Sequence, residues 1–211
     1  MSIQPAKIAQ AAEDLYLAEK SGQQIDLLSL QYKSMDMADA YAVQAALVEK
    51  KLARGRHIIG WKIGLTSRAM QDALKIDTPD SGVLLDDMAF ATGDTVPKGR
   101  FIQPRIEAEI AFVMKSDIAG ESISRADVIA ATDYVAPSLE ILDTRVKRMD
   151  PITGEIRTVC DTISDNAANA GIVMGDARHA FEARDVRWVG AIVQRDNVVE
   201  ETGLGAGVLN D

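Results

Sequence analysis

The sequence predicts an α+β fold in which an N-terminal helical region precedes a mixed, β-rich body. Apolar side chains recur with the helical period over residues 5–20 and again over 37–54. Further along, the pattern changes to short apolar runs separated by Gly, Pro and Asp, which is typical of strands joined by turns. The change divides the chain into an expected helical region over 1–55 and a β-rich region over 56–211.

Local signals place the individual elements. Asp36 is a candidate N-cap for the second helix, and Gly55 is a candidate stop. Strands are expected over the apolar runs at 57–65, 82–85, 105–114, 133–142, 171–174, 186–194 and 198–202. Short helices are expected at 67–75, at 124–132 behind a capping box of Ser124 and Asp127, and around 163–170. Residues 195–197 predict a hairpin turn between the last two strands.

The glycine-rich ending lacks a closing apolar element over residues 203–211. We therefore expect the C-terminal part of the fold to be missing from this chain. The alternative is a naturally short chain with a frayed end.

Composition narrows the class of protein. The 211 residues are 47% hydrophobic and 26% charged, as in ordinary globular proteins. A net charge of −9 disfavours nucleic acid and acidic membranes as partners, so we expect small-molecule partners. No stretch is apolar for long enough to span a bilayer, and the N-terminus lacks the apolar stretch of a signal peptide, which predicts a cytoplasmic protein.

The sequence has too few cysteines and histidines to form a structural metal site from sulfur and imidazole ligands. One cysteine, Cys160, excludes an intrachain disulfide, and His57 and His179 are too few for a Cys/His zinc cluster. Neither histidine has the neighbours of a catalytic triad, so nucleophilic catalysis is not supported. Any bound metal needs oxygen ligands, which points to Mg²⁺, Mn²⁺ or Ca²⁺.

Two carboxylates lie in an otherwise apolar strand. Because side chains alternate along a strand, Glu107 and Glu109 share one face at about 7 Å from each other. Partly buried anions at that spacing need a cation between them. Glu140, in a second apolar run, adds a third carboxylate and favours a hard-cation site. The alternative is an edge strand with Glu107 and Glu109 facing solvent.

Lys62 shares its strand face with Gly60 and Gly64, which leaves space around its ammonium group. That space can hold a ligand, and a lysine among apolar walls can act as a base. The alternative is a lysine that reaches solvent from an edge strand.

The residue types of the stretch 78–82 favour a plain turn, although a turn can also direct the Asp80 side chain into a site.

Residues 161–171 are rich in short hydrogen-bonding side chains. Either Ser164 or Asp165 caps a helix here, or Ser164 and Asn166 present donors to a bound acid. Basic side chains precede this stretch at Arg145, Lys147, Arg148 and Arg157. Such a loop is usually a solvated surface, and the alternative is a clamp for a second carboxylate of the substrate.

Several of these segments form one ordered set of motifs: residues 60–67, Pro79 and Asp80 with Gly82, 105–109, 139–140, and 161–171. Together they resemble the hydratase/decarboxylase family of the fumarylacetoacetate hydrolase superfamily. The resemblance covers the chain from the N-terminal helices to the last residue. It implies a barrel-like body over 56–211 that lacks its final C-terminal strands here, and a homo-oligomeric assembly.

The resemblance also implies roles for individual residues. Glu107, Glu109 and Glu140 would bind Mg²⁺ or Mn²⁺, while Lys62 and Asp80 would transfer protons. The expected substrate contacts are Leu65, Ser164, Asn166 and Arg157.

The implied activity is that of a hydro-lyase of aromatic catabolism. It would hydrate the dicarboxylate 2-oxohept-4-ene-1,7-dioate to 4-hydroxy-2-oxoheptane-1,7-dioate. Sibling decarboxylases of the family usually lack an acid at the position of Asp80, so its presence favours hydration. Three alternatives stay open: a 2-oxo-3-hexenedioate (4-oxalocrotonate) decarboxylase, a 2-hydroxypenta-2,4-dienoate hydratase, and a non-catalytic metal-binding subunit.

Overall fold

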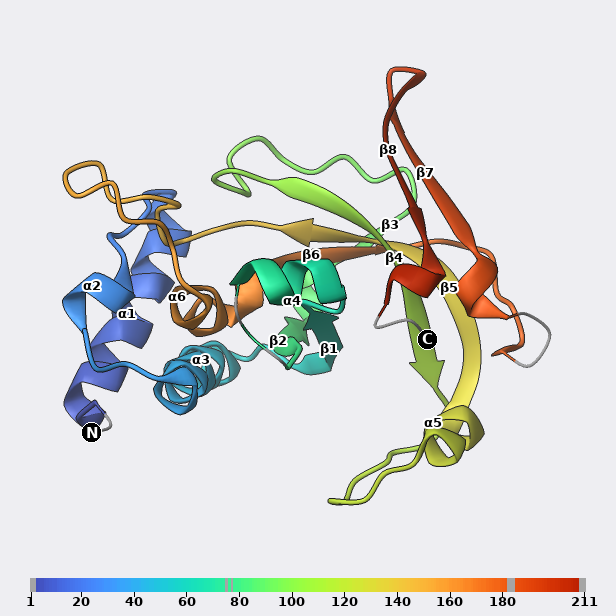
Figure 1. Ribbon diagram of the computed structural model, residues 1–211, viewed down its shortest axis with the longest axis horizontal. Helices are drawn as coiled ribbons and strands as arrows, with labels where there is room; N and C mark the ends of the chain where they lie inside the picture. Colours follow the sequence, from blue (N-terminus) through green and yellow to red (C-terminus); the bar gives the residue numbers. More distant parts are fainter. Residues whose placement is uncertain (1–2, 75, 77, 182–184, 209–211) are drawn as a thin grey trace.

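The helices of residues 5–52 gather at one end of the molecule, and most of the strands lie toward the other (Figure 1). The structure is a computed structural model that describes residues 3–74, 76, 78–181 and 185–208. The expected combination of an N-terminal helical region with a β-rich body is confirmed at this level. Among the described residues, no helix combines the length and the apolar character that crossing a membrane requires.

Two long helices form the N-terminal end. Helix α1 (Pro5–Ser21) starts with proline at its first position, where no backbone N–H is needed. Helix α3 (Met37–Leu52) starts with a reciprocal capping box, because the Asp36 side chain accepts from the Asp39 backbone and the Asp39 side chain accepts in return. The expected N-cap at Asp36 is confirmed.

These helices and the short helix α2 (Leu28–Gln31) enclose the largest apolar core. Its most buried members are Leu15, Leu27, Leu28, Val43, Leu47 and Val146. Val146 comes from the β-rich region and bridges Ile25 in the parallel sense. The core therefore joins the helical region to the segment that follows residue 142 of the β-rich region.

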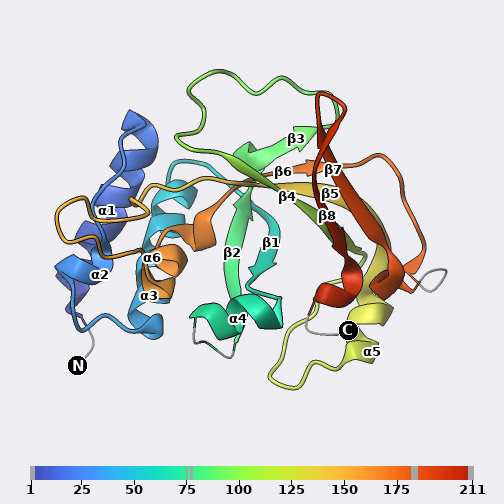
Figure 2. The ribbon, with the colours of Figure 1, turned by 45° about the horizontal axis from the view of Figure 1, so that its top comes forward.

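A four-stranded sheet in the order β3-β6-β5-β4 forms the centre of the β-rich region (Figure 2). Its strands are β3 (Ala89–Ala91), β4 (Arg105–Met114), β5 (Thr132–Leu142) and β6 (Asn169–Met174). The pairs β4–β5 and β5–β6 are antiparallel, whereas β3 and β6 are parallel. Strand β4 therefore lies at an edge of the sheet as far as the structure describes it.

A separate antiparallel pair consists of β1 (Ile58–Gly64) and β2 (Asp80–Leu85), joined through helix α4 (Arg68–Leu74). Leu84 and Leu85 of β2 pack with Met88 in a second, small apolar cluster. This pair lies between the N-terminal helices and the four-stranded sheet (Figure 2).

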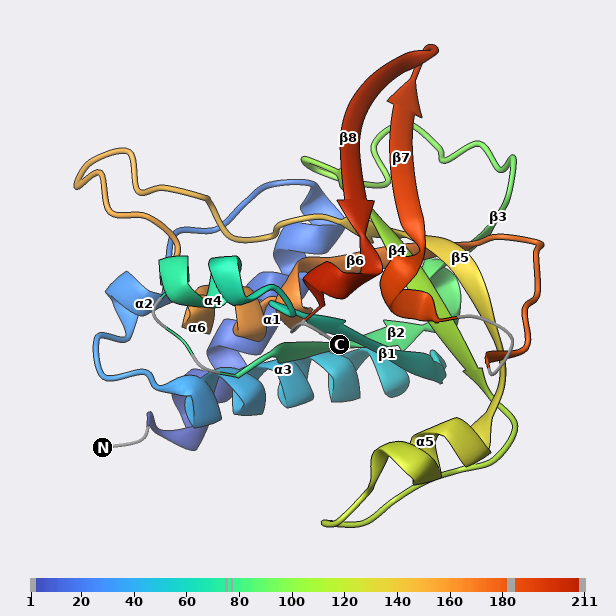
Figure 3. The same ribbon diagram turned by 45° about the vertical axis from the view of Figure 1, so that its right-hand side comes forward.

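The last elements are peripheral. Helix α5 (Arg125–Ala131) has the expected capping box of Ser124 and Asp127. Strands β7 (Gly190–Arg195) and β8 (Val198–Leu204) form a hairpin that projects away from the sheets (Figure 3). Its turn at Asp196 and Asn197 has φ values of 51° and 64°, as a two-residue hairpin turn requires. The expected hairpin is confirmed.

The expected bounds of a helix and a strand in the C-terminal half differ from those in the structure. The helix expected around 163–170 begins earlier, as α6 (Val159–Ser164), because Thr158 and Asp161 form its capping box. Ser164 and Asp165 are therefore not its N-cap. The strand expected from residue 186 begins at Gly190, since Val186–Trp188 form a 3-10 turn (η4) behind Asp185.

Candidate metal and proton-transfer site

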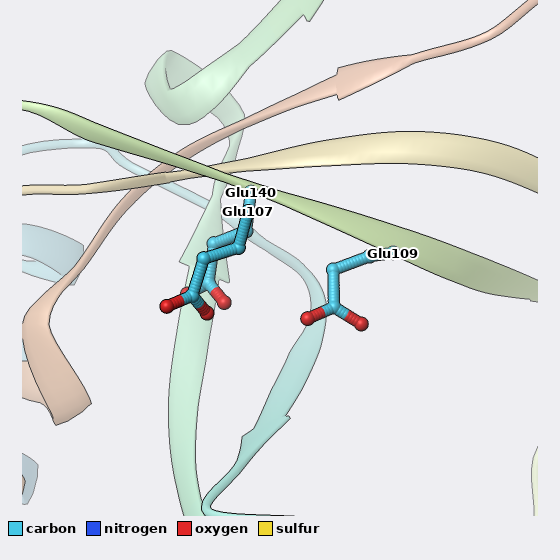
Figure 4. A group of neighbouring side chains, drawn as sticks. All are labelled: Glu107, Glu109 and Glu140. Carbon is cyan, nitrogen blue, oxygen red and sulfur yellow. The ribbon is translucent and has the colours of Figure 1, made fainter. Parts of the chain in front are cut away.

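The antiparallel register of β4 and β5 brings three glutamates together. Glu107 lies opposite Glu140, and Glu109 lies opposite Ser138. Figure 4 shows all three glutamate side chains leaving the strand pair on the same side, with Glu107 beside Glu140. One carboxylate oxygen from each lies within 4.8 Å of the others. The spacing suits one cation held among three oxygens.

The first two glutamates are more exposed than the sequence predicts, although the Glu109 carboxylate is still partly desolvated. Glu107 and Glu109 are exposed, because β4 is the edge strand of the described sheet. Glu140 lies on the neighbouring interior strand and is only 7% exposed. The alternative interpretation, an edge strand whose glutamates face solvent, is therefore correct for β4. Glu107 and Glu109 differ from ordinary surface acids because their carboxylates converge with that of the buried Glu140.

The three carboxylates carry more negative charge than the neighbouring Lys62 can balance. Burial raises the pKa of Glu140 to about 7, Lys62 opposes the rise, and Glu107 and Glu109 add to it. The pKa of Glu109 is also raised, mainly by desolvation of its carboxylate and further by the negative charge of Glu107. Oε1 of Glu140 is buried and has no hydrogen-bond partner among the described residues. A bound cation would satisfy that oxygen and reverse the pKa shifts.

Strands β1 and β2 place Lys62 and Asp80 beside this cluster. Nζ of Lys62 lies 3.6 Å from Oε1 of Glu140 and 3.8 Å from Oδ1 of Asp80. Asp80 is 3% exposed, and burial raises the pKa of its carboxyl group, against the effect of Lys62. The turn expected over 78–82 is wrong for Asp80, which begins strand β2 and pairs with Gly64.

Gly64 provides the room for these two head groups. A Cβ at Gly64 would lie 2.3 Å from Oδ1 of Asp80 and 2.6 Å from Nζ of Lys62. The space that the sequence predicts beside Lys62 is therefore present, and it is filled by the ammonium group and its aspartate partner. At Gly60 a Cβ would meet only Leu84, at 3.9 Å.

We expect Gly64→Ala to push Lys62 and Asp80 apart and to lower kcat by about 100-fold, because misplacement by about 1 Å can cost that much. Gly60→Ala is the matched control, since its methyl group makes an ordinary contact. Steady-state kinetics and thermal melts of both variants measure the effect. Equal kcat values for the two alanine variants would contradict the crowded geometry around Lys62.

Leu65, an expected substrate contact, follows β1 in a left-handed conformation with φ of 56°. Its carbonyl accepts from Nε2 of the buried Gln71 at 2.8 Å, so helix α4 holds the strained backbone in place. This left-handed residue follows directly after the strand that carries Lys62.

The two expected donors of the 161–171 stretch differ from each other. Ser164 is fully buried, and its Oγ has no partner among the described side chains and backbone groups. Asn166 is a correction: its Oδ1 accepts from the Val83 N–H at 2.8 Å, and its Nδ2 donates to the Val83 carbonyl at 2.9 Å. Both polar atoms of its amide are engaged by β2, which assigns Asn166 a role in holding that strand in place of the expected contact with an acid.

The basic loop is also partly corrected. The Arg145 guanidinium forms a buried ion pair with Asp165, and Nη2 donates to the Asp165 carbonyl at 2.6 Å. Lys147 pairs with Asp26 at 2.6 Å. Neither is available as a clamp. Arg157 differs, because its Nη1 is buried without an acceptor among the described residues and burial lowers the pKa of its guanidinium.

Sequence reasoning missed the polar side chains that hold β2. Gln44 of α3 is 6% exposed, and its Nε2 donates to the carbonyls of Ser81 and Ile163 at 2.8 and 3.0 Å. Asn169 donates from Nδ2 to the carbonyl of Val83 at 3.1 Å. The available signal was an amide on the apolar face of a helix, which marks a buried group that requires partners.

Comparison with known proteins identifies the family. The chain is 50% identical over 199 residues to 2-oxo-hept-4-ene-1,7-dioate hydratase of Escherichia coli, which covers 94% of this chain and 74% of that protein. The chain belongs to the hydratase/decarboxylase family. It is also 37% identical over 205 residues to 2-keto-4-pentenoate hydratase of Paraburkholderia xenovorans, with 97% of this chain and 74% of that protein covered. No family model matches the sequence.

Solved structures of the hydratase/decarboxylase family superpose closely. The structure of 4-oxalocrotonate decarboxylase from Pseudomonas putida G7, complexed with magnesium and adipate, matches with a TM-score of 0.90 at 33% identity. The match covers 99% of this chain and 77% of that one. A second structure of that decarboxylase, complexed with calcium and acetate, gives a TM-score of 0.89.

Proposed function

We propose that this protein is a divalent-metal-dependent hydratase that converts 2-oxohept-4-ene-1,7-dioate to 4-hydroxy-2-oxoheptane-1,7-dioate. The observation that carries the proposal is the meeting of three glutamates with Lys62 and Asp80 on one side of the β4–β5 pair. The 50% identity to the Escherichia coli hydratase supports the substrate class. The reaction places the protein among the hydro-lyases of aromatic catabolism.

The three glutamates fit Mg²⁺ or Mn²⁺ as ligands. All the donors are carboxylate oxygens, which hard divalent ions prefer, and the buried Oε1 of Glu140 lacks another partner in the described part of the chain. A bound ion would supply Lewis-acid stabilisation of the negative charge that develops on the substrate. The magnesium and calcium complexes of the similar decarboxylase support this choice of ion.

The chain's own groups transfer the protons. Loss of a proton from C3 and protonation of the 2-oxo group convert the 2-oxo-4-ene to its dienol, 2-hydroxyhepta-2,4-dienedioate. We assign to Lys62 and Asp80 the removal of the proton from the 2-hydroxyl group of this dienol and the delivery of a proton to C5, which gives a 2-oxo-3-enoate. Water then adds across C3 and C4, with its oxygen on C4 and a proton on C3. Burial raises the pKa of Asp80, so this carboxyl group holds a proton at higher pH than a solvated aspartate.

The second candidate is decarboxylation, which the similarity to 4-oxalocrotonate decarboxylase of Pseudomonas putida favours. The buried Asp80 beside Lys62 supports hydration instead. The test incubates the protein and Mg²⁺ separately with the seven-carbon dienol diacid, the five-carbon dienol acid and 2-oxo-3-hexenedioate. We expect loss of dienol absorbance and a 4-hydroxy-2-oxo diacid by NMR. Release of CO₂ as the main reaction would identify a decarboxylase, and no turnover despite metal binding would identify a non-catalytic subunit.

Leu65, Ser164 and Arg157 remain our proposed substrate contacts. Ser164 and Arg157 are supported by buried polar atoms, Oγ and Nη1, that lack a partner among the described residues. Arg157 suits the second carboxylate, because charge-assisted hydrogen bonds are strong. We expect Arg157→Met to raise KM for the seven-carbon diacid by about 10-fold or more and to leave KM for the five-carbon monoacid unchanged. A parallel rise for both substrates would remove Arg157 from this role.

We further propose that residues 56–211 form a barrel-like catalytic domain supported by the helical region 1–55, and that the protein acts in the cytoplasm as a homo-oligomer. Every proposed catalytic residue lies within 56–211. The face of β1 opposite Lys62 exposes large apolar side chains, Trp61 and Ile63 at 65% and 56%, which supports assembly. Light scattering of the purified protein measures the oligomeric state.

A further inference from the structure

Strand β2 is held by backbone pairing along one edge and by side chains along the other. Its partner strand is β1, and in the described part of the chain no second strand pairs with it. On the free edge, the Ser81 N–H donates to Oη of Tyr41 at 3.2 Å, and Nε2 of Gln44 donates to the Ser81 carbonyl at 2.8 Å. Both side chains come from α3.

Asn166 completes this edge at Val83. Its Oδ1 accepts from the Val83 N–H at 2.8 Å, while its Nδ2 donates to the Val83 carbonyl at 2.9 Å. These two bonds are the pair that a residue of a neighbouring antiparallel strand would make. Asn169 also donates to the Val83 carbonyl, at 3.1 Å, but only Asn166 bonds both the N–H and the carbonyl of Val83 and so takes the place of a strand at the middle of β2.

The backbone that presents Asn166 is strained. Asn166, Ala167 and Ala168 have φ values of 53°, 53° and 57°, a left-handed conformation that alanine rarely adopts and asparagine tolerates better. The turn persists because its surroundings fix it: the Ala168 N–H donates to the Asp165 carbonyl at 2.9 Å, and Arg145 donates to the same carbonyl.

The turn also touches β2 directly. A Cβ at Gly82 would lie 2.5 Å from the carbonyl oxygen of Asn166, so only glycine permits this approach. Gly82 is the register partner of Lys62, and Asp80 lies two residues before it on the same strand face. The contact between turn and strand therefore occurs opposite Lys62 of β1 and two residues from Asp80 of β2.

We propose that Asn166 is a positioning residue for Lys62 and Asp80, which acts by fixing the backbone of β2 and not by contacting the substrate. The inference rests on the proposed roles of those two residues. Through Val83, Asn166 sets the place of β2 relative to β5. That placement sets the distance of 3.6 Å from Lys62, on the strand paired with β2, to Glu140 of β5. The distance of 3.8 Å from Lys62 to Asp80 lies within the β1–β2 pair, which moves as one unit.

Asn166→Gly is the most informative variant, because glycine removes the amide and relaxes at a φ of 53°. Ala167→Gly is the matched control: it introduces glycine at the same φ in the same turn and leaves both Val83 bonds in place. We expect Asn166→Gly to lower kcat by about 10- to 100-fold with KM and Mg²⁺ affinity nearly unchanged, and the control to stay within about twofold of the unchanged protein.

Hydrogen exchange gives a readout that does not depend on activity. In Asn166→Gly, we expect faster exchange in peptides from β1 and β2 and unchanged exchange in peptides from β4 and β5. Asn166→Asp keeps an acceptor for the Val83 N–H, so it should recover part of the lost kcat. If Asn166→Gly does not fold, kcat and hydrogen exchange of Asn166→Asp are compared with those of Ala167→Gly instead.

Other outcomes would overturn the inference. A rise in KM at constant kcat would make Asn166 a substrate contact. Equal losses of thermal stability in Asn166→Gly and Ala167→Gly, with kcat per folded molecule and strand exchange unchanged, would leave Asn166 a purely structural role. If the unchanged protein turns over none of the three substrates, the proposed function fails, whereas the exchange comparison still decides whether Asn166 holds β2.

Discussion

Glu140→Gln is expected to abolish measurable Mg²⁺ binding and to lower kcat by a factor of about 1,000 or more, since a catalytic metal contributes several kcal/mol. Glutamine keeps the size of the side chain and removes the charge. Calorimetric titration with Mg²⁺ and steady-state rates measure the two effects. Glu121→Gln is the control, because it removes one exposed negative charge outside the cluster.

The same variant should make the metal-free protein more stable at neutral pH. The pKa of Glu140 in the folded protein is about 7, above its ordinary value of 4.5. Its protonated form therefore favours folding, and this stabilisation is full below pH 4.5 and is lost as the pH rises through 7. Mg²⁺ binds the ionised form, so the rise in Tm with Mg²⁺ should be larger at pH 8 than at pH 5.5.

A Glu140→Gln protein that binds Mg²⁺ normally would exclude Glu140 as a ligand.

Asp80→Asn is expected to lower kcat for hydration by about 100- to 10,000-fold, the usual range for a general acid or base, with Mg²⁺ affinity retained. The amide keeps the shape of the side chain and cannot exchange protons. Rates measured with the seven-carbon dienol diacid, together with Mg²⁺ titration, separate the two properties.

Lys62→Met should cause a loss of similar size, and the double variant should lose little more, because residues that act as a unit are not additive. Independent, multiplying losses would mean that Lys62 and Asp80 act in different steps. A fully active Asp80→Asn protein would remove the residue on which the choice of hydration over decarboxylation depends.

Strand periodicity predicted the shared face of Glu107 and Glu109, because alternation is a local property of an extended chain. The position of Glu140 opposite Glu107 depends on the register of β4 against β5. Register is set by turns and by the whole sheet, so the sequence alone indicated a third carboxylate without fixing its place. The exposure of β4 likewise follows from its edge position, which a local apolar pattern does not encode.

Partners far apart in the sequence account for the remaining differences. The sequence suggested that Arg145 belongs to a basic clamp, yet its guanidinium forms an ion pair with Asp165, which lies 20 residues further on. Asn166 looked like a substrate donor, yet its amide bonds Val83, which lies 83 residues earlier. Side-chain type shows that each group needs a partner and does not show which one. The left-handed turn at residues 166–168 also contains no glycine that could have indicated it.

The most direct test of the central claim is a crystal structure of the protein with Mn²⁺, in which anomalous scattering locates the ion. We expect one strong peak among Glu107, Glu109 and Glu140, with oxygen ligands at about 2.1 Å, close to the distances of a hard octahedral ion. An ion bound elsewhere, or an empty triad in crystals of a protein that binds Mn²⁺ in solution, would contradict the proposed metal centre.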